Sequence, residues 1–217
     1  MKTLNTSPLR PLERLIIEKL IVLVPPFIGT KAITFFSLLS SIGVFISYYL
    51  CKKSYSFLFL ASFFIVMEWI FDCLDGAIGR VRNEGFITWG YYMDHLFDYF
   101  FLASVIFGIH FLFPQMGLQI LLLFFISSSY MVIFFLRQAA AKELEFKISF
   151  GSFSPIEFRL SVILFNALLY FNTSLVKTLA SRYFSFLNLA LSLLLVVIVY
   201  SHQKQLDKYD RANQRPV

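Results

Sequence analysis

Six apolar stretches fill most of this 217-residue chain. Each is close to the ~20 residues that cross a bilayer as a helix. Hydrophobic residues make up 58% of the chain, and 28 residues are phenylalanine. A soluble domain of this size has no core large enough to bury so much apolar surface. The sequence therefore predicts an all-α polytopic membrane protein with six transmembrane helices, at 32–50, 55–79, 91–113, 117–137, 157–174 and 181–200.

An amphipathic segment precedes the first predicted span. Residues 9–24 carry leucine and isoleucine at helical spacing, with charged residues on the opposite side, and Pro25-Pro26 ends the pattern. We expect an interfacial helix that lies on the membrane surface. The chain then divides into an N-terminal interfacial helix and the segment after it at 1–31, a six-helix transmembrane domain at 32–200 and a basic tail at 201–217.

Lysine and arginine are distributed unevenly between the two ends of the predicted bundle. Fifteen of the 19 fall on the side of the N-terminus, and only Lys52, Lys53, Lys177 and Arg182 fall on the other side. Cytoplasmic loops carry such an excess, so we expect both termini in the cytoplasm. This topology accounts for the net charge of +6, and nucleic acid is not expected as a partner.

Five carboxylates lie within or beside the second and third predicted spans, on the cytoplasmic side. They are Glu68, Asp72, Asp75, Asp94 and Asp98. Residues three or four apart share one face of a helix, so the aspartates of each span face the same way. Ionisable groups at membrane depth are costly and face a bundle interior, a partner or a water-filled cavity. The five acids are therefore expected to line one crevice.

The nearest cation in the sequence is Arg80, with Arg82 and His95 close by, and these do not balance five acids. A cluster of oxygen ligands without cysteine or paired histidine suits a hard ion such as Mg²⁺ or Mn²⁺. The sequence therefore predicts a divalent metal site. Ion pairs between helices, or a relay for protons or cations, remain alternatives for the same residues.

The order of these residues resembles the signature of the CDP-alcohol phosphotransferases, also called CDP-alcohol phosphatidyltransferases, which are integral membrane enzymes of phospholipid synthesis. Their pattern is D-x-x-D-G-x-x-A-R, about eight residues, then G-x-x-x-D-x-x-x-D. Here Gly79 replaces the alanine, and residues 81–89 make the connection longer. The segment VPPFIGTKAIT is similar to the family's V-P-x-x-x-x-P-N-x-I-T, with Thr30-Lys31 in place of Pro-Asn.

The resemblance implies transfer of a phosphatidyl or phospho-alcohol group from a CDP-linked donor to an alcohol, with release of CMP. It makes 32–200 the catalytic domain. Two Mg²⁺ or Mn²⁺ ions are expected on Asp72, Asp75, Asp94 and Asp98, and the last of these is also the expected catalytic base. Nucleotide contacts are expected from Gly76, Gly79, Arg80, Thr34 and Thr88. Acceptor contacts are expected from Arg159, in a P-x-E-x-R sequence that many relatives share, and from Lys142.

The expected partners are a CDP-linked lipid or alcohol donor, an alcohol acceptor and membrane lipid, with a homodimer as the assembly. CDP-diacylglycerol is the favoured donor because six spans in a short chain are typical of that branch. The Asp94-His95 pair favours the alternative, a CDP-aminoalcohol:diacylglycerol phosphotransferase. Two other classes remain open. An aspartate-rich prenyltransferase lacks the G-x-x-[AG]-R run, and a proton-coupled transporter should carry inverted repeats, which we do not find in the sequence.

Overall fold

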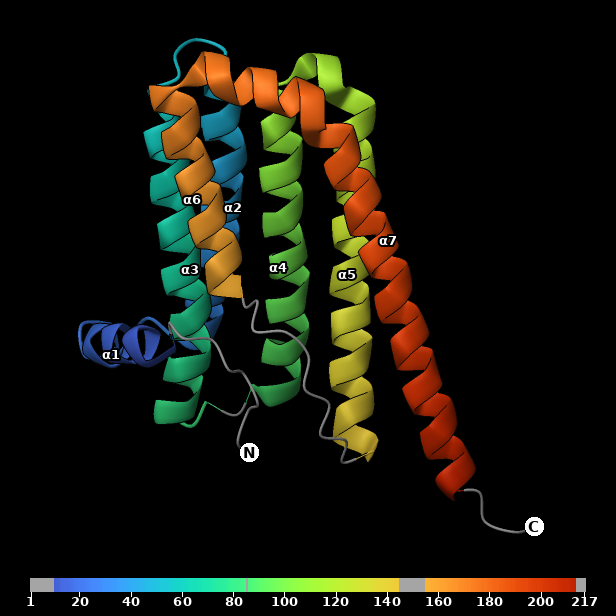
Figure 1. The fold of residues 1–217 in the computed structure, drawn as a ribbon. Helices are drawn as coiled ribbons and strands as arrows, with labels where there is room; N and C mark the ends of the chain where they lie inside the picture. Colours follow the sequence, from blue (N-terminus) through green and yellow to red (C-terminus); the bar gives the residue numbers. More distant parts are fainter. Residues whose placement is uncertain (1–9, 85, 145–154, 214–217) are drawn as a thin grey trace.

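The computed structural model describes residues 10–84, 86–144 and 155–213, and within these ranges the chain forms helices and connections without a strand (Figure 1). The α-helices are α1 (Arg10–Ile21), α2 (Thr30–Leu50), α3 (Phe57–Val81), α4 (Ile87–His110), α5 (Gly117–Leu144), α6 (Pro155–Phe171) and α7 (Thr173–Asn213). A 3₁₀ turn, η1 (Pro114–Met116), joins α4 to α5. The all-helical prediction is confirmed for the described residues.

Among the described residues, five segments are long and apolar enough to cross a membrane. They are Thr30–Leu50, Phe57–Val81, Thr88–His110, Pro114–Ile133 and Thr173–Lys204. Four of them coincide with the first four predicted spans, and the fifth contains the predicted span at 181–200. The predicted span at 157–174 corresponds to α6, which has only 17 residues. Within the ranges that the structure describes, the bundle therefore has five candidate spans together with the shorter helix α6.

The bundle core is apolar and continuous through α2, α3, α4 and α6. Ile65, Val105 and Leu169 are almost completely buried there. Tyr48 is also buried, and its hydroxyl donates a hydrogen bond to Asn166 Oδ1 at 2.8 Å. A buried phenol needs such a partner, because an unpaired polar group in an apolar interior is costly. The pair therefore ties α2 to α6 at the centre of the bundle.

The outward faces of the long helices carry large apolar side chains. More than half of the surface of Phe63, Leu118, Leu164 and Leu193 is exposed, on four different helices. Soluble monomers rarely expose apolar patches of that extent, whereas lipid tails cover them without cost. Together with the five long apolar helices, this surface identifies an integral membrane protein.

The C-terminal part of the chain differs from the prediction in its continuity. Only Asn172 separates α6 from α7, and α7 runs over 41 residues without interruption. Its first part crosses the end of the bundle where α6 finishes, and the helix then descends beside α5 (Figure 1). The predicted tail at 201–217 does not begin at a break, because helical hydrogen bonding continues to Asn213.

A second, smaller apolar cluster holds α1 against the bundle. Ile17 is 7% exposed and packs with Ile33 of α2 and Leu74 and Ile78 of α3. α1 lies across the direction of the bundle helices (Figure 1). It ends at Ile21, before the two prolines that were expected to end it. This cluster brings α1 close to the part of α3 that carries the aspartates.

Candidate functional site

The acidic residues gather where α3 ends and α4 begins. Asp72 and Asp75 lie in the last three turns of α3, and Asp94 and Asp98 lie in the first half of α4. The two helices run in opposite directions and are joined by a short connection, so these parts lie at the same end of the bundle (Figure 1). α1 and the C-terminal part of α7 lie toward that end as well.

A single arginine on α6 joins the acids of both helices. Arg159 Nε and Nη2 donate to the two carboxylate oxygens of Glu68 at 2.6 and 2.8 Å. Nη2 also donates to Asp72 Oδ2 at 3.1 Å and to Asp98 Oδ1 at 3.4 Å. The guanidinium carbon lies 5.1 Å from the centre of the Phe101 ring. Arg159 is thus the shared cation of a buried cluster formed by α3, α4 and α6.

The expectation that Arg80, with Arg82 nearby, is the cation in reach of the acids is incomplete: Arg80 is close enough to Asp75 for a favourable charge interaction, but the cation that pairs with the cluster is Arg159. Arg80 is exposed and forms no ion pair within the described part of the chain. Arg82 donates to backbone carbonyl groups instead. The signal for Arg159 was present in the sequence, because an arginine inside an apolar helix of a membrane protein needs a partner. The identity of that partner, 91 residues away, was not visible.

Asp75, another acid of the predicted site, is bonded to a threonine of α2 and not to Arg159. Thr34 Oγ1 lies 3.0 Å from Asp75 Oδ2 and donates to it, and the same oxygen lies 2.9 Å from the Thr30 carbonyl oxygen. Both side chains are buried between α2 and α3. Thr34 therefore fixes one oxygen of Asp75 and orients the carboxylate.

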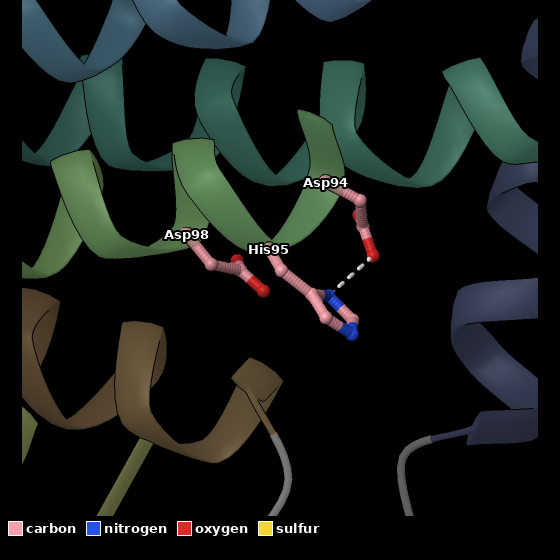
Figure 2. Close-up of side chains that lie close together, drawn as sticks. All are labelled: Asp94, His95 and Asp98. Carbon is pink, nitrogen blue, oxygen red and sulfur yellow. Dashed lines mark ion pairs between the residues drawn. The ribbon is translucent and has the colours of Figure 1, made fainter. Parts of the chain in front are cut away.

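His95 was not among the predicted site residues, although the structure brings it beside two of them. Figure 2 shows the side chains of Asp94, His95 and Asp98 on the same side of α4, with His95 Nδ1 3.3 Å from Asp94 Oδ2. The imidazole ring stacks on Phe135 of α5, with ring centres 4.0 Å apart. Its two nitrogens are buried and make no hydrogen bond to the described residues.

These donors fit a divalent metal ion. One ligand atom from each of Glu68, Asp72 and Asp98 lies within 4.8 Å of the others, and Asp94, His95 and Asp98 form a second group of the same kind. Asp98 belongs to both groups. Carboxylate oxygens are the ligands that Mg²⁺ and Mn²⁺ prefer, and His95 Nε2, which makes no hydrogen bond to the described residues, offers a further ligand atom. The cluster can therefore hold metal, with Asp98 at its centre.

The predicted nucleotide residues of α3 lie next to the acids. Gly76 is beside Arg80, because a Cβ atom on Gly76 would lie 3.2 Å from Arg80 Nη1. Gly79 faces α2, where a Cβ atom would lie 3.3 Å from Thr30 Oγ1. The small residue at Gly79 thus permits close packing of α2 on α3, whatever its role toward a nucleotide.

Two further predicted contact residues are Thr88, for the nucleotide, and Lys142, for the acceptor, and neither belongs to the acidic cluster as the structure describes it. Thr88 is exposed in the first turn of α4. It lines an apolar groove of about 500 Å³ between α4 and α5, together with Tyr92, Met131 and Phe135. His95 reaches the same groove from the side of the acids. Lys142 falls at the end of α5, where its side chain lies outside the described residues.

The connection after α3 is bonded to the connection before α2. Arg82 donates to the carbonyl oxygens of Ile28 at 2.6 Å and Val24 at 2.8 Å. Glu84 accepts a hydrogen bond from the Thr30 backbone N–H at 3.0 Å, which satisfies an otherwise open donor at the start of α2. Between them, Asn83 has a φ of 52°, in the left-handed region that asparagine tolerates. We refer to Arg82 and Glu84 as the connection clamp.

Comparison with known proteins agrees with this geometry. The family model described as CDP-alcohol phosphatidyltransferase matches residues 28–200. That range contains α2 to α6 and most of α7, and therefore every acid and arginine of the cluster. No curated protein matches the chain significantly. Because the family model covers well over half of the sequence and includes the whole site, the chain belongs to the CDP-alcohol phosphatidyltransferase family, a family of membrane transferases.

Proposed function

We propose that this protein transfers a phosphatidyl or phospho-alcohol group from a CDP-linked donor, with CDP-diacylglycerol as the favoured one, to an alcohol, releasing CMP. The observation that carries the proposal is the meeting of Asp72 and Asp98, from two helices, on one side of a membrane bundle whose sequence matches the family. A CDP-linked donor carries a pyrophosphate, and such an acidic site can bind it only with cations between the two.

Two Mg²⁺ or Mn²⁺ ions are proposed on Asp72, Asp75, Asp94 and Asp98. Asp72, Asp94 and Asp98 belong to the groups of ligand atoms within 4.8 Å of one another, which supports their part of this assignment, and Asp75 lies outside both groups. The chemistry that such ions supply when bound is neutralisation of the pyrophosphate and polarisation of the phosphoryl group. Thr34 orients Asp75 through its 3.0 Å hydrogen bond. Thr34, Gly76, Gly79 and Thr88 are proposed to contact the nucleotide.

The remaining steps are assigned to side chains of the chain itself. Arg80 is exposed beside Gly76, so its guanidinium is available to donate two parallel hydrogen bonds to phosphate oxygens. Asp98 takes the proton of the acceptor hydroxyl while the hydroxyl oxygen bonds to phosphorus. The bond from that phosphorus to CMP breaks, and CMP leaves with the electron pair.

Arg159 and Lys142 are proposed to bind the acceptor. The hydrogen bonds of Arg159 to described residues use Nε and Nη2, so the two hydrogens on Nη1 remain for an oxygen of the acceptor. Arg159 also lies beside Asp98, the proposed base, which would place an acceptor hydroxyl near both groups.

Release of CMP from CDP-diacylglycerol tests the function and its metal requirement together. We expect turnover with a small polyol or its phosphate, loss of all turnover in EDTA, and recovery when Mg²⁺ or Mn²⁺ is added in excess. The control is EDTA saturated with Mg²⁺ beforehand, which should have no effect. Full turnover in EDTA would contradict the metal assignment. Turnover only with a CDP-aminoalcohol and diacylglycerol would show that the protein is a CDP-aminoalcohol:diacylglycerol phosphotransferase instead.

We further propose six spans, with α1 at the interface and the site and both termini in the cytoplasm. At 1.5 Å per residue, α6 is about 26 Å long, close to the thickness of the hydrocarbon layer. It also lies beside α3 within the bundle (Figure 1). The excess of Lys and Arg on the side of the acids supports the orientation. Helical residues 201–213 would then enter the cytoplasm, and the outer faces of the bundle are available for a homodimer.

Cysteine labelling can test the orientation, provided that introduced cysteines are used. The natural Cys51 is 5% exposed and lies against the Ser47 carbonyl group, so a reagent will not reach it. In a Cys51→Ala, Cys73→Ala background, an impermeant maleimide should modify Lys53→Cys in right-side-out vesicles. Lys204→Cys should react only after the vesicles are opened. Both lysines are exposed, so accessibility differs only by side of the membrane. The opposite pattern would reverse the topology.

A further inference from the structure

The proposed mechanism leaves one acid of the cluster, Glu68, without a role. Its side chain is 1% exposed, which makes it the most deeply buried of the five carboxylates. It lies one turn before Asp72 on α3. A buried carboxylate is costly unless it is paired and hydrogen-bonded, so its partner determines what it can do.

That partner is Arg159, whose hydrogen bonds are distributed unequally among the acids. Both oxygens of Glu68 accept short hydrogen bonds, of 2.6 and 2.8 Å, from two different nitrogens. Asp72 and Asp98 each accept one longer bond, of 3.1 and 3.4 Å, and both come from Nη2 alone. A bidentate pair is the stronger and more directional arrangement of the two. The charge of Arg159 is therefore balanced mainly by Glu68.

The unequal sharing has a consequence for Asp72 and Asp98. If no other carboxylate balanced its charge, the guanidinium between Asp72 and Asp98 would neutralise one of them and repel a metal cation. With Glu68 as the main counter-ion, the pair formed by Glu68 and Arg159 is neutral overall. Asp72 and Asp98 share only the part of the Arg159 charge that Glu68 leaves, and Nη2 still holds them near each other across α3 and α4.

We propose that Glu68 is a positioning residue, which holds Arg159 and balances its charge so that Asp72 and Asp98 remain free to bind a divalent cation. The inference rests on the proposed metal site. It adds that the ligands depend on an ion pair behind them, between α3 and α6. Glu68 acts through Arg159 and does not itself contact the ion.

Charge counting gives the expected effect of each substitution. Glu68→Gln removes one negative charge, and Arg159 then has only Asp72 and Asp98 as carboxylate partners. Mn²⁺ affinity should fall about tenfold or more, because buried charges are weakly screened. Glu68→Gln with Arg159→Met removes one charge of each sign and frees both aspartates. Its Mn²⁺ affinity should return to within about threefold of wild type.

The measurement is Mn²⁺ binding to the purified full-length protein in detergent, followed by electron paramagnetic resonance without any substrate. The series is wild type, Glu68→Gln, Glu68→Asp and the double variant. Glu68→Asp keeps the charge, so its affinity should stay close to wild type although its geometry changes. Glu18→Gln is the matched control, since Glu18 is an exposed carboxylate on α1 paired with Arg14. It should not change Mn²⁺ affinity. If Glu68→Gln does not fold, the double variant decides: affinity within about threefold of wild type supports the inference because Glu68 is then not a ligand, and a loss of about tenfold or more overturns it.

Each outcome separates this inference from the proposed function. Restored affinity in the double variant supports a role through Arg159. Affinity that stays low in the double variant overturns it, because Glu68 would then be a ligand itself. Unchanged affinity in Glu68→Gln overturns the inference alone and leaves the metal site standing. A wild-type protein that binds no Mn²⁺ overturns both.

Discussion

Asp98→Asn should lower the single-turnover rate by about 10²–10⁴-fold, the usual contribution of a general base. The amide keeps the size of the carboxylate and can still accept a hydrogen bond, but it cannot take the proton of the acceptor. The contact that it weakens is a single 3.4 Å bond from Arg159 to a side chain that is 21% exposed. The fold should therefore remain intact, and the loss should appear in the chemical step.

Asp72→Asn is the matched comparison. Asp72 has the same exposed fraction, 21%, and also accepts one bond from Arg159 Nη2, so the two substitutions perturb the cluster similarly. We expect Asp72→Asn to weaken metal and nucleotide binding together, and Asp98→Asn to weaken nucleotide binding much less than it slows turnover. Nucleotide affinity and single-turnover rate should be measured on both. Equal loss of nucleotide binding would show that Asp98 is a ligand and not the base.

Arg159→Met should lower the free energy of unfolding by about 3–5 kcal/mol, because it leaves the buried Glu68 without its counter-ion. For a chain of this length that corresponds to a fall of about 6–20 °C in the melting temperature. Glu68→Gln in the same chain should recover most of the loss, since removing both partners of a buried pair is often neutral. The measurement is thermal unfolding of the purified protein in detergent.

Arg211→Met is the control for this stability series. Arg211 also pairs with an aspartate, Asp207, at 2.9 Å, but the pair is exposed on α7. Exposed pairs contribute about 0–1 kcal/mol, so this variant should melt close to wild type. If Arg159→Met were as stable as Arg211→Met, the buried pair would not hold α6 to the bundle.

The clustering of the acidic residues could be predicted from the sequence because its geometry is mostly local. Spacings of three and four residues decide which side chains share a helix face, and the short connection between α3 and α4 brings the two faces together. The positions of the five candidate spans followed from apolar length in the same way. Helical periodicity and one short connection therefore suffice to predict that the side chains of the four aspartates lie at the same end of the bundle.

What the sequence did not predict depends on packing between distant segments. The bond between Arg159 and Glu68 requires α6 to return beside α3, and the burial of Cys51 requires the connection after α2 to fold inward. Neither is visible in periodicity. The contact of Thr34 with Asp75 and the stacking of His95 on Phe135 are of the same kind. The continuity of α7 past residue 200 was missed because a change from apolar to charged composition does not end a helix.

The connection clamp has a consequence for the order in which the chain is built. Arg82 follows the carbonyl groups of Val24 and Ile28 by 58 and 54 residues. At a synthesis rate of about 5–20 residues per second, Arg82 is made about 3–12 s after the two carbonyl groups to which it donates. The connection between α1 and α2 can be completed only after α3 has left the ribosome. The seating of the N-terminal helix therefore follows the emergence of α3, although this helix is the first to be made.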